Sequence, residues 1–209
     1  VNMPAPVAKR AIEAGARIPD ADLAEDGRET EPHVTVKYGL HGEDPEAVRE
    51  ALAEVGPITL TPGKTSLFKN EDAEVLKVDV DSPDLHRVNS LVAKMIPNTE
   101  THPYYQPHIT IAYLKAGRGD KYAGKLVPGV SGKPITVDTV TFSGKDGEKV
   151  DIPLAGSVIK SPDLAAREDY QIGDTVEFQI GKETRKGVVS GEPSGHRVRV
   201  TGENGSKLR

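Results

Sequence analysis

Residues 32–38 read PHVTVKY and residues 107–113 read PHITIAY, so the chain carries one phrase twice, with Pro, His, Thr and Tyr at matching offsets. In a β-strand, alternate side chains point to opposite faces. Each phrase therefore predicts a strand that buries its Val or Ile residues and its tyrosine, and that presents an imidazole beside a hydroxyl on the other face. The two polar pairs are His33 with Thr35, and His108 with Thr110.

The repetition favours function over packing. A lone His-x-Thr on a strand is most often structural, with its histidine satisfied by a neighbour. Duplicating a strand for packing alone would keep its apolar face, but gives no reason to keep His and Thr on the opposite one. If both strands lie centrally in a two-lobed sheet, the two pairs converge on one cleft. Lys37 shares the face of His33, where it either contacts phosphate or is simply solvated.

Two imidazoles and two hydroxyls at one cleft suit the cleavage of a phosphodiester. Histidine titrates near neutral pH, so one imidazole can accept the proton of the attacking oxygen while the other protonates the leaving oxygen. The threonine hydroxyls can hydrogen-bond the non-bridging oxygens, where negative charge builds. This chemistry requires no metal or other cofactor, and no cluster with metal-ligand spacing accompanies the nearby His102.

The two phrases resemble the signature of the 2H phosphoesterases, the superfamily that includes the 2′-5′ RNA ligase-like proteins and cyclic phosphodiesterases. Its pattern is His-x-Thr or His-x-Ser with an apolar middle residue, occurring twice; the histidines here are 75 positions apart (108 minus 33). The resemblance covers about residues 1–155. It implies a bilobed α+β fold with antiparallel sheets and pseudo-twofold symmetry, and metal-independent chemistry at phosphodiesters. It also implies that His33 and His108 are the catalytic pair and that Thr35 and Thr110 hold the phosphate.

The substrate remains open at this stage, as does which histidine is the base. A 2′,3′-cyclic phosphate, a 2′-5′ linkage and a cyclic oligonucleotide all fit. The stretch PHVTVKYGL also resembles a phage-encoded subgroup, some of whose members degrade cyclic nucleotide signals or form part of virion-associated proteins. The alternatives are a non-catalytic module that binds a nucleotide or a partner within a larger, viral assembly, and RNA end processing.

The charge composition indicates which class of nucleic-acid ligand the chain can bind. The formal net charge is -5, and residues 1–50 alone hold 11 acidic against 6 basic side chains. Because long nucleic acid is held largely by phosphate neutralisation, we expect a small nucleotide rather than a polymer. Tyr104 and Tyr105 precede the second phrase, and either ring could stack on a nucleobase or cover the edge of the core; Tyr105 is the candidate for substrate binding.

The chain has 209 residues and no cysteine, so it can form neither a disulfide framework nor a thiolate metal site. No apolar run approaches the ~20 residues that cross a bilayer, and the N-terminal residues contain no signal-type stretch. We therefore expect a cytoplasmic protein without a membrane partner, located in the host cytoplasm if it is viral.

Periodicity and caps predict the remaining elements. Helices are expected over 4–16, over 43–56 with Asp44 as its cap, and over 82–96 with Ser82 as its cap; strands are expected over 57–68, broken near Pro62, and over 73–81; a hairpin is expected over 134–154, and residues 18–31 read as loop. The apolar stripe of the third helix is predicted to comprise Leu85, Val88, Val92, Met95 and Ile96.

The domain organisation changes near residue 160. We predict a phosphoesterase-like domain over 1–157, a linker over 158–168 and a small all-β domain over 169–209. The last segment has short alternating runs separated by Gly-rich turns, which is the rhythm of an SH3-like barrel. Such barrels are common interaction units, so this segment is a candidate site for a protein partner.

Overall fold

The computed structural model describes residues 1–99, 104–145 and 147–155, together with the backbone of the strands at 175–180, 183–194, 197–202 and 207–208. Its helices are α1 (Ala5–Ala16), α2 (Pro45–Ala51) and α3 (Pro83–Met95), with the 3-10 turns η1 (Asp20–Asp22) and η2 (Asp120–Tyr122). Its strands are β1 (Leu23–Arg28), β2 (Ile58–Lys69), β3 (Ala73–Asp81), β4 (His108–Lys115), β5 (Ile135–Val137), β6 (Thr139–Ser143), β7 (Lys149–Pro153), β8 (Thr175–Ile180), β9 (Glu183–Ser194), β10 (Arg197–Gly202) and β11 (Lys207–Leu208).

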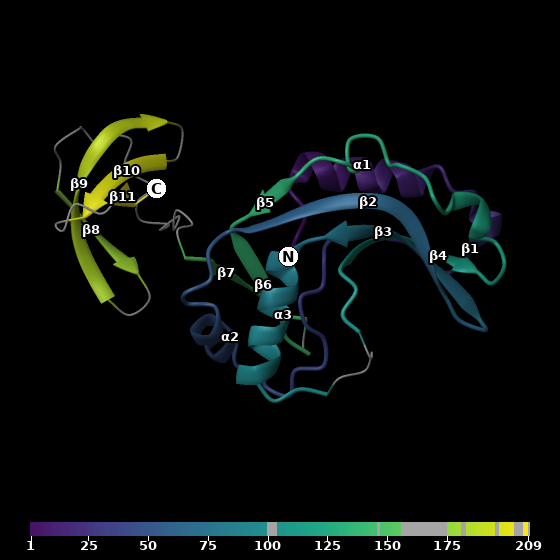
Figure 1. Ribbon diagram of the computed structural model, residues 1–209, viewed down its shortest axis with the longest axis horizontal. Helices are drawn as coiled ribbons and strands as arrows, with labels where there is room; N and C mark the ends of the chain where they lie inside the picture. Colours follow the sequence, from purple (N-terminus) through teal and green to yellow (C-terminus); the bar gives the residue numbers. More distant parts are fainter. Residues whose placement is uncertain are drawn as a thin grey trace.

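Five strands form a curved sheet in the order β1-β4-β3-β2-β5, and every neighbouring pair is antiparallel. Helix α1 lies over the convex face of the sheet, whereas α2, α3 and the β6–β7 hairpin lie on the concave side (Figure 1). Helix α1 packs closely on β4. At Gly15 of this helix, an added Cβ would lie only 3.1 Å from the carbonyl oxygen of Ile111. The predicted α+β architecture on antiparallel strands is confirmed.

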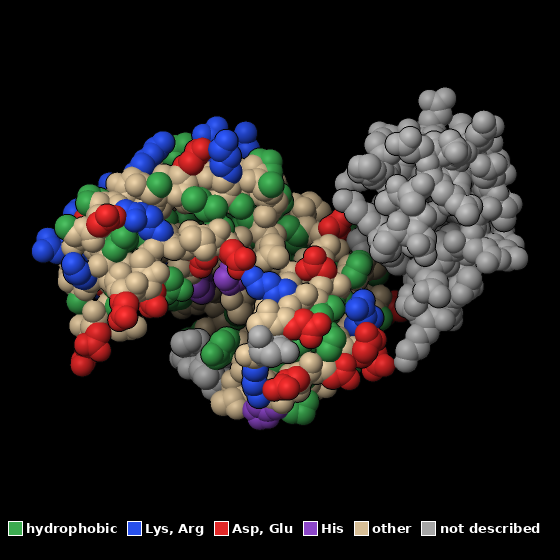
Figure 2. Space-filling model, turned by 180° about the vertical axis from the view of Figure 1, so that it is seen from behind, with side chains coloured by type: hydrophobic (Ala, Val, Ile, Leu, Met, Phe, Trp, Pro, Cys, Tyr) green, Lys and Arg blue, Asp and Glu red, His purple; other side chains and the backbone are tan. Residues whose placement is uncertain are grey.

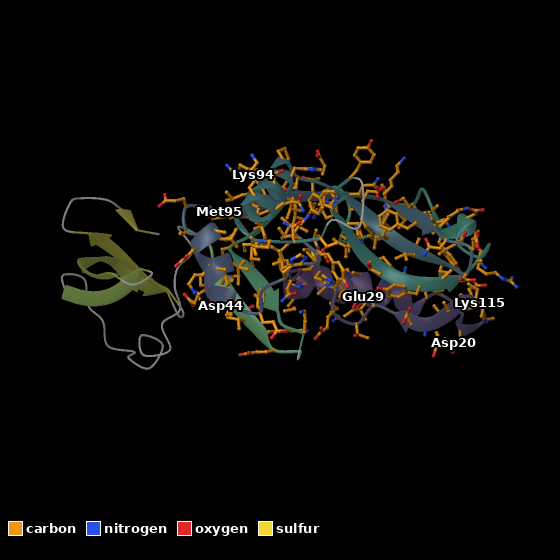
Figure 3. The ribbon with its side chains drawn as sticks, turned by 90° about the horizontal axis from the view of Figure 1, so that it is seen from below. Asp20, Glu29, Asp44, Lys94, Met95 and Lys115 are labelled. Atoms are coloured by element: carbon orange, nitrogen blue, oxygen red, sulfur yellow. The ribbon has the colours of Figure 1, made fainter. Side chains whose placement is uncertain are left out.

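The core is one continuous apolar cluster that includes the buried faces of the sheet and of α2 and α3. The predicted stripe of α3 is buried at Leu85, Val88, Val92 and Ile96. Met95 is the exception, because its side chain points to solvent at the end of the helix (Figure 3).

The predicted caps of α2 and α3 are confirmed. The Asp44 carboxylate accepts a hydrogen bond from the amide of Glu46 at 2.9 Å, and the Ser82 hydroxyl accepts one from the amide of Leu85 at 3.1 Å. Helix α2 is shorter than the predicted 43–56, because the chain leaves helical geometry at Leu52 and turns to bury Val55.

The first phrase was predicted as a strand, and this was wrong. Its regular pairing is limited to an isolated bridge between His33 and Asn2, flanked by main-chain hydrogen bonds such as that from the Val34 amide to the Val1 carbonyl at 2.8 Å. Beyond this point side chains satisfy the backbone, and the Asn89 amide donates to the Val36 carbonyl at 2.7 Å. The alternating burial of Val34 and Val36 therefore persists without a strand partner along the segment.

The acidic segment 18–31 was predicted as loop but contains β1, which pairs with the edge of β4. Its polar residues hide the strand from a periodicity search. The strand is anchored by Arg28, whose guanidinium donates to the Gly15 carbonyl at 3.1 Å and to the Ile18 carbonyl at 2.5 Å. The break expected near Pro62 is instead a register shift within a continuous β2.

The C-terminal half of the chain follows the predicted pattern where it is described. The predicted hairpin pairs β6 with β7, whereas β5, predicted as part of it, joins β2. Strands β8 to β11 form an antiparallel four-stranded sheet in the order β11-β10-β9-β8. Closure into an SH3-like barrel stays a prediction, and the predicted linker at 158–168 lies outside the described residues.

The buried cap of α3 gives a test of the fold. The Ser82 hydroxyl also donates to the carbonyl of Thr59 in β2 at 2.6 Å, so the same oxygen joins the helix to the sheet. Ser82→Ala leaves the buried amide of Leu85 without its acceptor and the Thr59 carbonyl without this donor, and we expect it to lower the free energy of unfolding by about 1–3 kcal/mol in urea titrations. The control Asp44→Ala removes an exposed cap and should cost less; equal losses would contradict this account.

Candidate active site

His33 is held by its own backbone. Its Nδ1 lies 2.8 Å from the carbonyl oxygen of Glu31, two residues earlier. The Glu31 carboxylate in turn forms an ion pair with Lys149 of β7, and this hydrogen bond together with the charge of His33 lowers the pKa of Glu31. An ionised carboxylate therefore lies beside the first imidazole.

His108 is held in the same way at the start of β4. Its Nδ1 lies 2.7 Å from the carbonyl oxygen of Gln106, again two residues earlier. The ring of Phe68 meets it edge-on, with the ring centroids 5.0 Å apart. Burial lowers the pKa of His108, the hydrogen bond to Gln106 opposes this shift, and the charge of Lys77 lowers the pKa further.

This matched anchoring fixes the chemistry of both imidazoles. A carbonyl oxygen only accepts hydrogen bonds, so Nδ1 must carry the proton in each ring. The nitrogen that titrates is then Nε2 in both His33 and His108. Each ring is consequently suited to accept or donate one proton at a defined atom.

A charge on His33 lowers the pKa of His108. The segments that carry them are also joined directly: the Tyr105 hydroxyl donates to the Thr35 carbonyl at 2.9 Å. Histidine side chains line the hollow beneath the curved sheet (Figure 2). The structure thus brings the two polar phrases to one region of the concave side.

The tyrosines of the two phrases do not lie where alternation predicts. Tyr38 is 72% exposed instead of buried. In β4 the register shifts so that Thr110 lies opposite Lys77 but Ala112 lies opposite Leu76. This extra residue moves Tyr113 to the face that carries Thr110.

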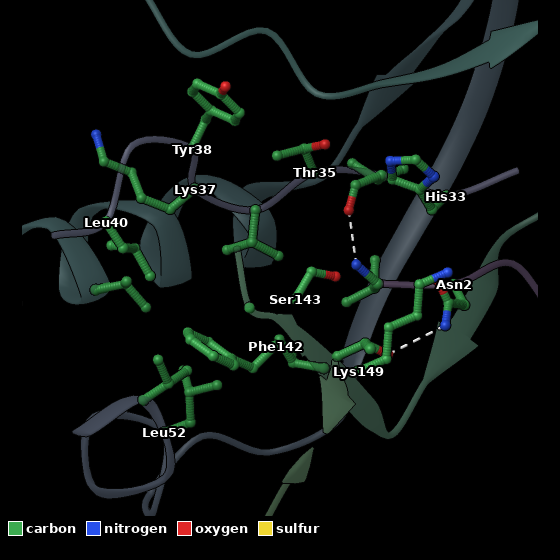
Figure 4. Close-up of a pocket in the computed structure, with 18 of the residues that line it drawn as sticks. Asn2, His33, Thr35, Lys37, Tyr38, Leu40, Leu52, Phe142, Ser143 and Lys149 are labelled. Atoms are coloured by element: carbon green, nitrogen blue, oxygen red, sulfur yellow. Dashed lines mark hydrogen bonds between the residues drawn. The ribbon is translucent and has the colours of Figure 1, made fainter. Parts of the chain in front are cut away.

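A cavity of about 640 Å³ adjoins the first phrase but not the second (Figure 4). It opens between residues 31–42 and the β6–β7 hairpin, and His33, Thr35 and Lys37 line it. His108 and Thr110 are not among its lining residues. The cavity thus takes in the first His-Thr pair alone, and the convergence of both pairs on one cleft stays a prediction.

Tyr105 joins the segment before the second phrase to the first phrase and to α3. Its hydroxyl is engaged by Thr35, its ring meets the ring of His86 with centroids 5.3 Å apart, and burial raises its pKa. Tyr104 is 77% exposed, so it is the ring of this pair that is open to a ligand.

Sequence reasoning missed the polar residues around His108. Ser66 of β2 and Lys77 and Asp79 of β3 share a hydrogen-bond network on the same sheet face. The alternation of KVDV at 77–80 was a usable signal, because it separates Lys77 and Asp79 from the buried Val78 and Val80.

Among the described residues, no group of three or more His, Cys, Asp or Glu side chains is arranged to hold a metal ion. None of the helices in this part of the chain has the length and apolar character that crossing a bilayer requires.

Comparison with known families assigns the chain. The family model of the 2′-5′ RNA ligase superfamily matches residues 4–142. The chain belongs to this superfamily. A solved structure similar to this 2′-5′ RNA ligase superfamily member is that of Kluyveromyces marxianus Usb1 with uridine monophosphate, with 12% identity, a TM-score of 0.42, and coverage of 74% of this chain and 94% of that chain. The search of curated proteins found no match.

The anchoring of the imidazoles predicts their tautomers. We expect His33 and His108 of this 2′-5′ RNA ligase superfamily member to be protonated at Nδ1 and unprotonated at Nε2 above pH ~8, where histidine is neutral, as read from ¹⁵N chemical shifts. His41 is an internal control, because its ring nitrogen lies 2.7 Å from a Thr99 hydroxyl, which can donate or accept. An Nε2-protonated form at either His33 or His108 would contradict the arrangement.

Proposed function

We propose that the protein is a metal-independent phosphodiesterase that cleaves a small nucleotide by acid/base catalysis. His33 and His108 are the catalytic pair. The observation that supports this is their matched anchoring through Nδ1, with the two rings electrostatically coupled. Two unrelated structural histidines have no reason to share this geometry.

The reaction divides between the two rings. One Nε2 takes the proton of an attacking water or ribose hydroxyl, and the other protonates the oxygen that leaves the phosphorus. In this proposal Thr35 and Thr110 donate to the non-bridging oxygens, on which charge increases in the transition state.

The cavity beside the first phrase suits the nucleoside part of a substrate. Its volume of about 640 Å³ lies within the range of small-molecule sites, roughly 300–1,000 Å³. Its walls combine apolar residues such as Phe142 with the polar Asn2, Thr141 and Lys37. A base could enter there while its phosphate stays between Thr35 and Thr110, and Tyr104 could stack at the rim. The substrate class remains a 2′,3′-cyclic phosphate, a 2′-5′ linkage or a cyclic oligonucleotide.

Activity is tested with a panel of these nucleotides in excess EDTA. We expect turnover to persist in EDTA, and His33→Ala and His108→Ala each to lower kcat by about 10²–10⁴-fold, since each removes a proton-transfer group. The control His41→Ala changes a histidine outside the proposed pair and should retain activity.

Turnover that EDTA abolishes, or that survives in the double variant, would refute the mechanism. Nucleotide binding in calorimetry without turnover of any panel member would support the alternative, a non-catalytic binding module. The same panel run in reverse, with cleaved ends as substrates, would reveal ligation.

The pH dependence of kcat/KM follows from the required protonation states. One imidazole must be neutral and the other charged, so we expect a bell-shaped profile. If His108 is the neutral partner, its lowered pKa places the acidic limb below the ordinary histidine value of about 6.5. A profile that is flat between pH 5 and 8 would argue against a histidine pair.

A further inference from the structure

Lys77 is a buried cation on the sheet face that carries His108 and Thr110. Its side chain is 4% exposed, and its Nζ donates to Ser66 Oγ at 2.7 Å and to Asp79 Oδ1 at 2.5 Å. Removing an ammonium from water is costly, and an apolar residue often stabilises a fold at least as well at such a position. The presence of Lys77 therefore calls for an explanation other than packing.

The register of β3 and β4 places this charge at the candidate site. Lys77 lies opposite Thr110, and Asp79 lies opposite His108. Phe68 contacts both Lys77 and His108. The centroid of its ring lies 4.2 Å from Lys77 Nζ and 5.0 Å from the centroid of the His108 ring. An aromatic ring excludes water, so the charge of Lys77 acts on the imidazole through a poorly screening medium.

The charges that face His108 come from two elements. From β3, Lys77 disfavours the imidazolium and Asp79 favours it; from the first phrase, a charge on His33 disfavours it. His33 itself lies beside the ionised Glu31, which is paired with Lys149. The second copy of the His-x-Thr phrase therefore lies beside an ion pair whose cation, Lys77, is buried, whereas the first lies beside the exposed pair of Glu31 with Lys149.

We propose that Lys77 is a positioning residue that, against the opposing charge of Asp79, makes His108 the proton acceptor of the reaction and leaves His33 as the proton donor. This inference rests on the proposed function. His108 Nε2 takes the proton of the attacking oxygen as that oxygen bonds to phosphorus. The bond from phosphorus to the leaving oxygen breaks, and the His33 imidazolium protonates that oxygen. The pair ends with its protonation states exchanged, so the two rings must exchange a proton with solvent before the next turnover.

The charge pair is tested without reference to activity by following the ¹H and ¹³C signals of His108 through a pH titration. Lys77→Met removes the positive charge while filling its buried space, and should raise the titration midpoint of His108. Asp79→Asn removes the negative charge, and should lower the midpoint. Both variants break the same ion pair, so a purely structural role would not shift the midpoint in opposite directions.

Two controls keep this test decisive. The Lys69–Asp120 ion pair lies elsewhere on the same domain, so Lys69→Met and Asp120→Asn should leave the His108 midpoint in place. If Lys77→Met fails to fold, Asp79→Asn still decides, because the Asp79 side chain is largely exposed and its replacement should be tolerated. An unchanged or raised midpoint in Asp79→Asn overturns the proposal.

The assignment of acid and base is tested with a nucleoside p-nitrophenyl phosphodiester, whose leaving group departs without protonation. We expect His33→Ala to lose about 10²–10⁴-fold on a natural nucleotide but less than about 10-fold on this ester. His108→Ala should lose as much on both substrates. The reverse pattern would make His33 the base and overturn the proposal.

The outcomes also separate this inference from the proposed function. If no nucleotide and no ester is cleaved, the proposed function fails, and with it the assignment of His108 as base, while the titration still shows whether Lys77 and Asp79 control that ring. If cleavage occurs and the acidic limb of kcat/KM follows the His108 midpoint in both variants, the assignment stands. If cleavage occurs but the acidic limb of kcat/KM does not move with the His108 midpoint, the proposed phosphodiesterase function stands and the role of Lys77 is refuted.

Discussion

The antiparallel pairing of β3 with β4 is the constraint on which the candidate site depends. Its register places Asp79 opposite His108 and Thr110 opposite Lys77. It also presses Ile109 and Ile111 into the core, so the polar face cannot turn away without exposing the apolar one. A slip of one residue would exchange the two faces, which would bury the histidine and expose isoleucine. The hydrophobic face thus determines where the imidazole can be.

The first phrase reaches the same region by a different route. It lacks a strand partner along most of its length, and side chains hold it instead: the Tyr105 hydroxyl binds the Thr35 carbonyl and Asn89 binds that of Val36. The chain then turns at Gly39, whose φ is +75° and where a Cβ would lie 2.5 Å from the Thr99 carbonyl oxygen. Only glycine fits this close approach, which ties the segment after the first phrase to the segment before the second.

The sequence predicted those parts of the structure that are set by local signals. Helix caps at Asp44 and Ser82 and the alternation in β4 depend on neighbouring residues, and they were found. The β1 strand was missed because its pairing comes from the main chain and from Arg28, neither of which leaves a periodic pattern. Tyr113 was misplaced because a register shift in β4 reverses the faces, and nothing in TIAY indicates it. The network around Lys77 was missed because it draws on two strands that only tertiary structure brings together.

The difference between the two copies is physically more informative than their identity. Two equivalent imidazoles at one phosphate would share a proton without preference, and half of the molecules would hold it on the wrong ring. The cation buried on the face of His108 works against that degeneracy, because the charge of Lys77 lowers the pKa of this ring while Asp79 opposes it. Since Lys77 is desolvated, its influence is screened less by salt than that of a surface charge would be. An identical phrase can therefore supply an acid and a base, provided that the strands around each copy carry different charges.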